Sequence, residues 1–205
     1  MSHYFTNEEI ESNLKKVQVK INDKSFTFNT DNGVFSKKGL DFGSRVLIET
    51  LLLEDLSGKV LDVGCGYGPI GIILSSFFNL NIDMIDINKR AIHLANMNIK
   101  ENNLKNISAS LSDIYSNVKD KYDYIITNPP IRAGKNIVYK ILFDAKKHLK
   151  KGGVLYFVIN KNQGAKSAIK DLEKVAKIEI LNKKSGFFVI KCIFNWHIYK
   201  SVVII

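Results

Sequence analysis

A carboxylate followed by three closely spaced glycines is the strongest chemical signal in this chain of 205 residues. Asp62 lies at the end of an apolar stretch that begins at Val60. Gly64, Gly66 and Gly68 follow at alternate positions, where they let the backbone bend tightly and approach a ligand closely. A helix is predicted to begin at the next residue, so its first N–H groups would face the same ligand. The pattern therefore predicts a small-molecule site over this loop.

The same loop also matches a second pattern, the fingerprint of dinucleotide-binding proteins. Gly66, Gly68 and Gly71 have its spacing, and Asp86 follows at a suitable distance. That fingerprint holds a pyrophosphate anion, which the charge of Asp62 would repel. A carboxylate instead suits a cationic ligand, such as the amino-acid end of S-adenosylmethionine. The position of Asp62 therefore favours S-adenosylmethionine over a nicotinamide dinucleotide, with a purely structural cap at the strand end as the alternative.

Two residues at the end of the second predicted strand fit the nucleoside part of such a ligand. Asp86 ends the sequence Met84-Ile85-Asp86 and can accept hydrogen bonds from both ribose hydroxyls. Ile87 follows it and can pack on the adenine ring. A helix N-cap is the alternative role of Asp86, and the two roles can coexist.

Residues 128–131 read Asn-Pro-Pro-Ile and follow the fourth predicted strand. In an open parallel sheet, ligands bind at the carboxyl ends of the strands, so this tetrapeptide is expected beside the glycine loop. Two prolines fix φ and remove two N–H donors, which leaves a rigid loop that presents carbonyl groups. The side-chain oxygen of Asn128 and the main-chain oxygen of Pro129 can then hold a planar NH₂ group in line with a methyl donor. A simple tight turn is the alternative.

From residue 59 onward, predicted strands alternate with predicted helices. Apolar runs and apolar positions at helical spacing distinguish the two. The predicted strands are 60–63, 81–85, 107–111, 122–127, 154–159, 177–181 and 187–194. The predicted helices are 40–53, 69–78, 89–102, 136–149 and 165–176. The segment Lys151-Gly152-Gly153 is predicted to terminate the fourth of these helices.

This alternation indicates an α/β fold with a doubly wound, mostly parallel sheet of seven strands. The last two strands have a short connection and must be antiparallel, because a parallel crossover needs a dozen or more residues. Upstream, residues 17–21 and 25–29 flank a turn-rich triplet and predict a β-hairpin. We therefore expect residues 1–38 to form an N-terminal extension that packs on a catalytic domain of residues 39–205.

The glycine loop and the Asn-Pro-Pro motif together resemble those of class I methyltransferases. Residues 60–68, Val-Leu-Asp-Val-Gly-Cys-Gly-Tyr-Gly, are similar to the first motif of that family. Residues 128–130 resemble the motif of its members that methylate exocyclic amines of bases or the glutamine amide. The resemblance implies a Rossmann-like methyltransferase fold with S-adenosylmethionine as cofactor. It also implies that Asp113, after the third strand, accepts a hydrogen bond from the adenine amino group.

A narrower resemblance involves the segments before the first helix and after the fourth strand. Residues 33–36 and 40–45, Gly-Val-Phe-Ser and Leu-Asp-Phe-Gly-Ser-Arg, look like the lead-in of the small-subunit ribosomal RNA guanine-N2 methyltransferases. Residues 128–135 resemble their single-domain bacterial members. The likeness extends from about Tyr4 to Cys192 and is to the catalytic half of the two-domain enzymes. It implies methyl transfer to N2 of a guanine in ribosomal RNA.

The residues around the Asn-Pro-Pro motif are expected to contact the substrate. Many relatives carry an aromatic residue after Pro130, whereas this chain has Ile131. We therefore expect Phe35 or aliphatic packing to replace aromatic stacking, with a flipped-out base held between Phe35 and Ile131. Arg132 and Lys135 follow directly and are expected to contact phosphates. Capping of the next helix is the alternative role for these two residues.

The charge of the chain favours a polyanionic partner. It has 30 Lys and Arg against 20 Asp and Glu, a net charge of +10. Such an excess is typical of proteins that bind nucleic acid, and ribosomal RNA or the small ribosomal subunit is the expected partner. An ordinary lysine-rich surface in contact with solvent is the alternative.

Cysteine content and hydropathy exclude several other classes. Cys65 and Cys192 are too few and too far apart for a disulfide framework or a zinc site, so we expect buried free thiols and no metal. No apolar run is long enough to span a bilayer, and residues 1–10 are polar, so a cytoplasmic protein without a membrane partner is expected. Trp196, His197 and Tyr199 follow the resemblance and are expected to form the end of the last strand and a tail.

Two other functions remain open at this point. A protein methyltransferase acting on a glutamine amide shares Asn-Pro-Pro, but it usually has Tyr next and a helical N-terminal domain. A non-catalytic RNA-binding factor could keep the fold, although intact Asp62, Asp86 and Asn128 argue against it. Both a monomer and a homodimer are compatible with the sequence.

Overall fold

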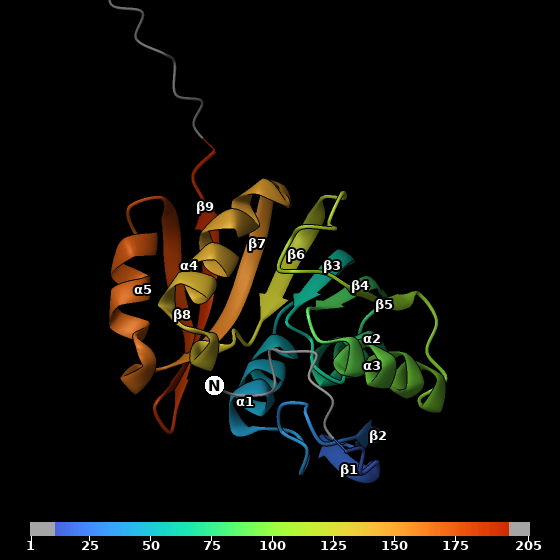
Figure 1. Ribbon diagram of the computed structural model, residues 1–205. Coiled ribbons are helices and arrows are strands. Elements are labelled where there is room, and N and C mark those ends of the chain that lie inside the picture. The colour runs from blue at the N-terminus through green and yellow to red at the C-terminus, as the bar shows by residue number, and fades with distance from the viewer. Residues whose placement is uncertain (1–10, 197–205) are drawn as a thin grey trace, which may run out of the picture.

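The computed structural model describes residues 11–196, which form a seven-stranded sheet with helices on both faces and a separate two-stranded hairpin (Figure 1). The hairpin consists of β1 (Lys15–Ile21) and β2 (Lys24–Thr30). The sheet strands are β3 (Gly58–Val63), β4 (Leu80–Asp86), β5 (Ile107–Leu111), β6 (Tyr122–Thr127), β7 (Leu149–Asn160), β8 (Ala176–Lys184) and β9 (Phe187–Phe194). The α-helices are α1 (Phe42–Leu51), α2 (Pro69–Phe77), α3 (Lys89–Glu101), α4 (Lys135–Asp144) and α5 (Ala165–Leu172).

The sheet has the strand order β5-β4-β3-β6-β7-β9-β8, which confirms the predicted doubly wound topology. The strands from β5 to β7 run parallel, and β9 is antiparallel to both of its neighbours. The carboxyl ends of β3 to β7 therefore lie at one edge of the sheet, and β9 begins at that same edge. We refer to it as the carboxyl edge.

Alternate residues of the central strands supply two separate hydrophobic cores. Val60 and Ile126 face α1, α2 and α3, whereas Leu61 and Ile125 face α4 and α5. This division follows from the two-residue period of a strand, which sends successive side chains to opposite faces. In open sheets covered by helices on both faces, ligands bind outside the carboxyl ends of the strands, so the site is expected there.

The hairpin is attached to the sheet domain through a buried amide. Asn98 on α3 is fully buried and accepts hydrogen bonds from the backbone N and the side-chain Nδ2 of Asn29, at 2.6 and 3.0 Å. Its own Nδ2 donates to the carbonyl oxygens of Asn29 and Tyr67, at 3.0 and 2.9 Å. One side chain therefore links the hairpin, α3 and the glycine loop. The division of the chain into an extension of residues 1–38 and a catalytic domain of residues 39–205 stays a prediction.

Replacing Asn98 by alanine should lower the free energy of unfolding by about 2–4 kcal/mol, because several buried polar groups lose their partners. Urea denaturation of the purified variant measures this. Asn136→Ala, at an exposed position on α4, is the matched control and should change the free energy by less than about 0.5 kcal/mol. A similar small effect for both variants would show that Asn98 does not hold the hairpin in place.

The predicted end of the fourth helix is wrong. Helix α4 ends at Asp144 and continues only as a 3₁₀ turn, η3 (Ala145–Lys147). Lys151-Gly152-Gly153 lies inside β7, between the pair Leu149–Tyr122 and the pair Val154–Tyr124. Gly152 has φ +83°, and a glycine with positive φ serves a strand irregularity as well as a helix C-cap. The glycine pattern correctly indicates a residue with positive φ, but here that residue belongs to an irregularity in β7 and not to a helix C-cap.

Two smaller corrections concern the C-terminal part of the chain. Helix α5 ends at Leu172 instead of reaching residue 176, because Ala176 already pairs with Phe194 in the sheet. The last strand continues past Cys192, as predicted, but it ends at Phe194, so Trp196 is not part of it. The expected tail residues His197 and Tyr199 lie outside the described residues.

The structure also bears on the two cysteines and on membrane-spanning helices. Cys65 and Cys192 are both buried free thiols, as predicted. No helix in the described part of the chain is long and apolar enough to cross a membrane.

Candidate active site

The glycine loop has the backbone geometry that its sequence predicts. Gly64, Gly66 and Gly68 have φ values of +73°, +57° and +91°, a region that L-residues with side chains rarely adopt. The amides of Gly64 and Cys65 both donate to the carbonyl oxygen of Ile85, at 2.9 and 3.0 Å. The loop is thereby fixed to the end of β4. Gly68 is also the N-cap of α2. The first residue of that helix is Pro69, at a position where a missing N–H costs little.

Asp62 lies beneath this loop and is 1% exposed. Its Oδ2 accepts a hydrogen bond of 3.1 Å from the amide of Gly71. Its buried Oδ1 has no partner among the described residues. Burial raises the pKa of this carboxyl to about 7. A buried acceptor without a partner is costly, and a cationic donor in the loop would relieve that cost.

Asp86 ends β4 and faces the same loop. Its Oδ2 accepts from the amide of Gly66 and its Oδ1 from the amide of Asn88, each at 2.9 Å. Removal from water raises the pKa of this carboxyl. The backbone of Ile87 is a further hydrogen-bond partner, and a carboxylate with about four lone-pair sites still has room for a donor from a ligand.

The alternative role of Asp86 as the helix N-cap is wrong, because Asn88 caps α3. The Oδ1 of Asn88 accepts from the amides of Arg90 and Ala91, at 2.9 and 3.2 Å. Between the two lies Ile87, whose side chain is 38% exposed. This exposed apolar side chain lies directly after Asp86 at the end of β4.

Asp113 follows β5, at the same edge of the sheet. The neighbouring Ser112 donates from its backbone N to the carbonyl oxygen of Asp86 at 3.0 Å, which brings this segment to the end of β4. The side chain of Asp113 is exposed. The structure therefore places Asp62, Asp86, Ile87 and Asp113 around one edge of three adjacent strands.

The side chain of Asn128 is held from one side by the start of α1. Its Nδ2 donates to the Oγ of Ser44 at 3.0 Å and lies 3.3 and 3.4 Å from the two carboxylate oxygens of Asp41. Asp41 is also the N-cap of α1 and accepts from the amide of Ser44. A carboxylate only accepts hydrogen bonds, so the amide nitrogen faces α1 and the amide oxygen of Asn128 stays available as an acceptor.

The two prolines leave one main-chain acceptor beside this oxygen. The carbonyl oxygen of Pro130 is used by the amide of Ala133 at 2.9 Å, in the 3₁₀ turn η2 (Ile131–Ala133). Within residues 11–196, the carbonyl oxygen of Pro129 accepts no hydrogen bond. A Cβ built on Gly64 would lie 4.0 Å from Cδ of Pro130, so the glycine loop and the Asn-Pro-Pro loop are in contact.

The loop between β2 and α1 connects the two halves of the site. At one end, the carbonyl oxygen of Gly33 accepts from Nδ2 of Asn88 at 2.9 Å, next to Asp86. At the other end, Asp41 contacts Asn128. Phe35 lies between these two anchors and is 48% exposed. The loop therefore passes across the carboxyl edge with an aromatic ring open to a ligand.

The remaining predicted residues flank the Asn-Pro-Pro loop on its other side. Ile131 is half-buried against the core under α4, and Arg132 is exposed in the turn η2. Lys135 is exposed at the first residue of α4, whose N-cap is Gly134. The alternative that Arg132 and Lys135 cap this helix is therefore wrong, because Gly134 is its N-cap.

Sequence reasoning missed the roles of Asp41 and Ser44. Both residues are in the lead-in segment, but they are more than eighty positions away from Asn128, their partner. A signal was present, since an Asp followed three residues later by a polar residue before an apolar run is an N-cap pattern. That pattern predicts the start of a helix, but it does not say which loop the cap will contact.

This arrangement can place an amino group next to a bound nucleoside. The acceptors of Asn128 and Pro129 are adjacent, uncharged and rigid, which suits a planar NH₂ group with two hydrogens. Among the described residues, no group of three potential metal ligands is present.

Comparisons with known proteins assign the chain to a family. The methyltransferase small domain matches residues 25–191. The chain is 45% identical over 194 residues to the uncharacterized protein YbxB of Bacillus subtilis, covering 92% of this chain and 96% of that protein. It is 31% identical over 185 residues to ribosomal RNA small subunit methyltransferase C of Psychromonas ingrahamii, covering 88% of this chain but 52% of that protein.

Solved structures show the same fold in enzymes with different substrates. The T. thermophilus 16S rRNA N2 methyltransferase, in complex with AdoMet and guanosine, has a TM-score of 0.80 at 23% identity, covering 92% of this chain and 52% of that one. A ribosomal protein methylase of Lactobacillus delbrueckii has a TM-score of 0.67 at 18% identity, covering 76% and 80%. The chain thus spans nearly all of YbxB but about half of the ribosomal RNA methyltransferases it matches. On the family match and the identity to these relatives, the chain belongs to the methyltransferase small domain family.

Proposed function

We propose that this protein transfers a methyl group from S-adenosylmethionine to the N2 amino group of a guanine in small-subunit ribosomal RNA. The observation that carries the proposal is the orientation of Asn128, whose Nδ2 is bound by Asp41 and Ser44 while its oxygen stays available. The relatives that match over most of this chain include a small-subunit ribosomal RNA methyltransferase. A structural neighbour of the same fold is named as binding AdoMet and guanosine together.

The residues of the glycine loop fit S-adenosylmethionine. The unpartnered Oδ1 of Asp62 suits a ligand that brings positive charge to the loop, and a phosphate would be repelled there. Asp86 would hold the ribose hydroxyls, and Ile87 would pack on the adenine. Asp113 would accept a hydrogen bond from the adenine amino group. When bound, the cofactor supplies an electrophilic methyl group at the junction of the glycine loop and the Asn-Pro-Pro loop.

The acceptor side of the reaction needs positioning more than it needs a base. The side-chain oxygen of Asn128 and the carbonyl oxygen of Pro129 would each accept one hydrogen of the guanine amino group. This fixes the nitrogen in line with the methyl group and favours the positive charge that develops on it during transfer. The methylated nitrogen then loses one proton to water. Phe35, Pro130 and Ile131 would enclose the base.

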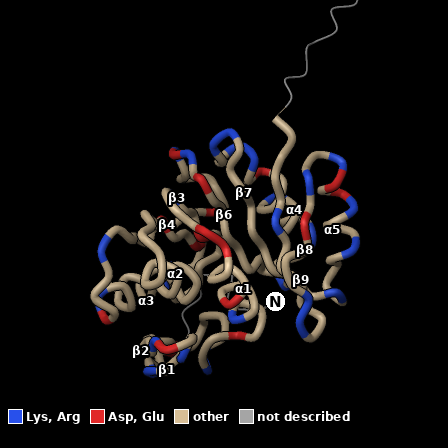
Figure 2. The backbone as a smooth tube through the Cα atoms, turned by 180° about the vertical axis from the view of Figure 1, so that it is seen from behind, with Lys and Arg blue, Asp and Glu red and all other residues tan. Residues whose placement is uncertain are grey.

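A ribosomal RNA substrate also accounts for the charge of the molecule. The chain has a net charge of +10, and Figure 2 shows Lys and Arg gathered along α5, β8 and the β8–β9 turn. Arg132 and Lys135 directly follow the Asn-Pro-Pro loop, where the phosphates beside a target base would pass. Mapping of methylated guanines in ribosomal RNA from cells with and without this protein tests the proposal. Loss of one N2-methylguanine is expected, and an unchanged map would refute it.

The affinity for S-adenosylmethionine should rise by roughly tenfold from pH 6 to pH 8, because the ionised fraction of Asp62 rises by about that factor when its pKa is about 7. Burial raises this pKa, so the protonated, uncharged form prevails at the lower pH. Calorimetric titrations at both pH values measure the change. In Asp62→Asn the affinity should vary much less with pH, and an equally steep dependence in the variant would assign the titration to another group.

A further inference from the structure

A cavity of about 340 Å³ lies beside the Asn-Pro-Pro loop, between α4, α5 and the 3₁₀ turn η4 (Lys161–Gln163). Its walls come from segments that all lie at the carboxyl edge of the sheet. They are Ile131, Lys135, Val138, Tyr139, Ile159, Asn162, Gln163, Gly164, Ser167 and Ala168. Ile131 belongs both to this wall and to the Asn-Pro-Pro-Ile segment, so the cavity adjoins the place of the target amine.

The lining combines apolar walls with free polar side chains. Val138, Ile159 and Ala168 are buried and form an apolar floor. The side chains of Asn162, Gln163 and Ser167 make no hydrogen bond with the described residues. Amide groups that offer both donors and acceptors above an apolar floor match a nucleobase, which has a flat apolar face and a polar edge.

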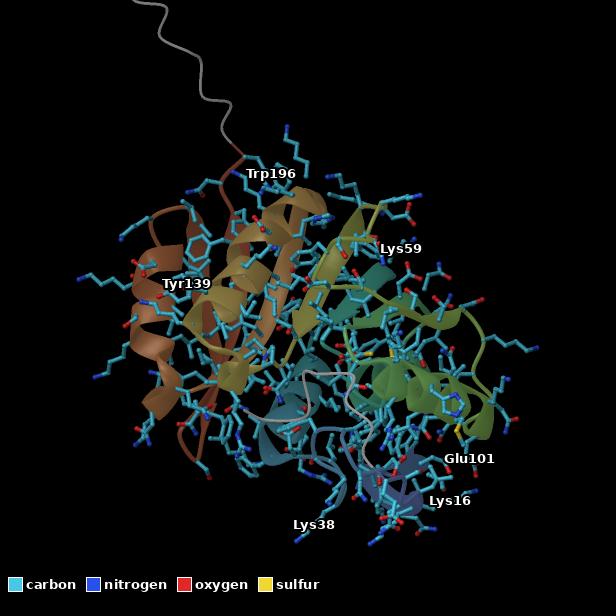
Figure 3. The ribbon with its side chains drawn as sticks, in the orientation of Figure 1. Lys16, Lys38, Lys59, Glu101, Tyr139 and Trp196 are labelled. Carbon is cyan, nitrogen blue, oxygen red and sulfur yellow. The ribbon has the colours of Figure 1, made fainter. Side chains whose placement is uncertain are left out.

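Tyr139 forms a fixed wall of the cavity. It projects from α4 toward α5 (Figure 3), and its hydroxyl donates to Oδ2 of Asp171 on α5 at 2.9 Å. Lys135 Nζ lies 4.8 Å from the centre of the Tyr139 ring. Asp171 is the carboxylate that faces this wall, and it also binds Nζ of Lys174 at 2.7 Å. The negative charge on this side is therefore already paired.

Cations without ion-pair partners among the described residues line the cavity or stand next in sequence to residues that line it. Arg132, Lys135, Lys161 and Lys166 are exposed and form no ion pair with the described residues. At the opposite edge of the sheet, three lysines are paired with carboxylates. Lys59 binds Asp83 and Asp120, Lys147 binds Asp144, and Lys150 binds Asp123. Figure 3 shows Lys59 at the end of the molecule far from Lys38, which lies in the loop that crosses the carboxyl edge.

We propose that this cavity binds the nucleotide adjacent to the target guanine in a single-stranded stretch of the substrate RNA. This inference rests on the proposed function, because the RNA strand must pass the Asn-Pro-Pro loop to reach it. The base would lie on the apolar floor with its polar edge on Asn162 and Gln163, and Lys135 and Lys161 would contact its phosphates. A single-stranded partner fits, since a paired base could not enter a cavity of this size.

Filling the cavity tests the assignment. Ser167→Phe places a ring in the cavity from an exposed position on α5, and Ser57→Phe makes the same change at an exposed position before β3, at the opposite edge. Fluorescence anisotropy with a labelled ten-nucleotide single-stranded RNA containing one guanine measures binding to the full chain. The affinity of Ser167→Phe should fall about tenfold, the scale of one bound base, and that of Ser57→Phe should not change. Equal affinities of the wild type and Ser167→Phe would overturn the proposal.

Photocrosslinking separates this proposal from the proposed function. The same RNA carries 4-thiouridine directly before or directly after the guanine, and mass spectrometry locates the crosslinked peptide. One of the two RNAs should crosslink within residues 159–168 or to Tyr139, and crosslinks elsewhere only would refute the cavity assignment. Methylation of guanine in this RNA is measured separately. If methylation is absent but the crosslink and the Ser167→Phe effect persist, the proposed reaction is wrong and the nucleotide site stands.

Discussion

Replacing Asn128 by alanine should slow methyl transfer by about 10²–10³-fold, because a positioned acceptor in the transition state is lost. The affinity for S-adenosylmethionine should change little, since the side-chain amide of Asn128 donates its hydrogen bonds to Asp41 and Ser44. Single-turnover methylation of small-subunit ribosomal RNA at saturating cofactor measures the rate. Calorimetry on the same preparation measures the affinity.

Two variants control for this effect. Asn128→Asp should retain more activity than Asn128→Ala, because a carboxylate still accepts hydrogen bonds from the amine. Asn195→Ala removes an exposed amide after β9, at the opposite edge of the sheet, and should leave the rate unchanged. If Asn128→Ala reacts at the wild-type rate, the Asn-Pro-Pro segment is only a structural turn.

Replacing Asp86 by alanine should weaken S-adenosylmethionine binding by roughly 1–3 kcal/mol, the scale of charge-assisted hydrogen bonds. Asp86 is expected to accept the ribose hydroxyls in addition to the amides of Gly66 and Asn88. Isothermal titration calorimetry measures the loss directly. Tighter binding of a nicotinamide dinucleotide than of S-adenosylmethionine, in the wild type, would overturn the cofactor assignment itself.

Asp83 provides a matched control on the same strand. Its carboxylate binds Lys59 at 3.1 Å and accepts from the hydroxyl of Tyr122 at 2.9 Å, away from the glycine loop. Asp83→Ala therefore removes the same charge from β4 without touching the cofactor site. Comparable losses of affinity in both variants would indicate a general effect of charge or folding and not a ribose contact.

Much of the fold could be predicted because its signals are local. The strand and helix periods, the glycines with positive φ and the short connection between β8 and β9 all depend on residues close in sequence. The error at Lys151-Gly152-Gly153 has the same origin. A positive-φ glycine has one local signature, and only the pairing of Leu149 with Tyr122 shows that the chain has already entered β7.

The candidate site was predictable residue by residue but not as a set of contacts. Asp62, Asp86 and Asn128 follow strand ends, so the topology of a parallel sheet brings them to one edge. What the sequence could not show is how Asn128 is oriented. That depends on Asp41 and Ser44, at the start of α1, which are distant from Asn128 in sequence and contact it only through the tertiary structure.

Incubation of the purified protein with methyl-tritiated S-adenosylmethionine and small ribosomal subunits from cells that lack it tests the central claim most directly. Digestion of the RNA to nucleosides and chromatography identify the product. The proposed mechanism predicts that the label is found in N2-methylguanosine and disappears with Asn128→Ala. Label in the glutamine of a ribosomal protein, in another nucleoside, or in no product at all would contradict it.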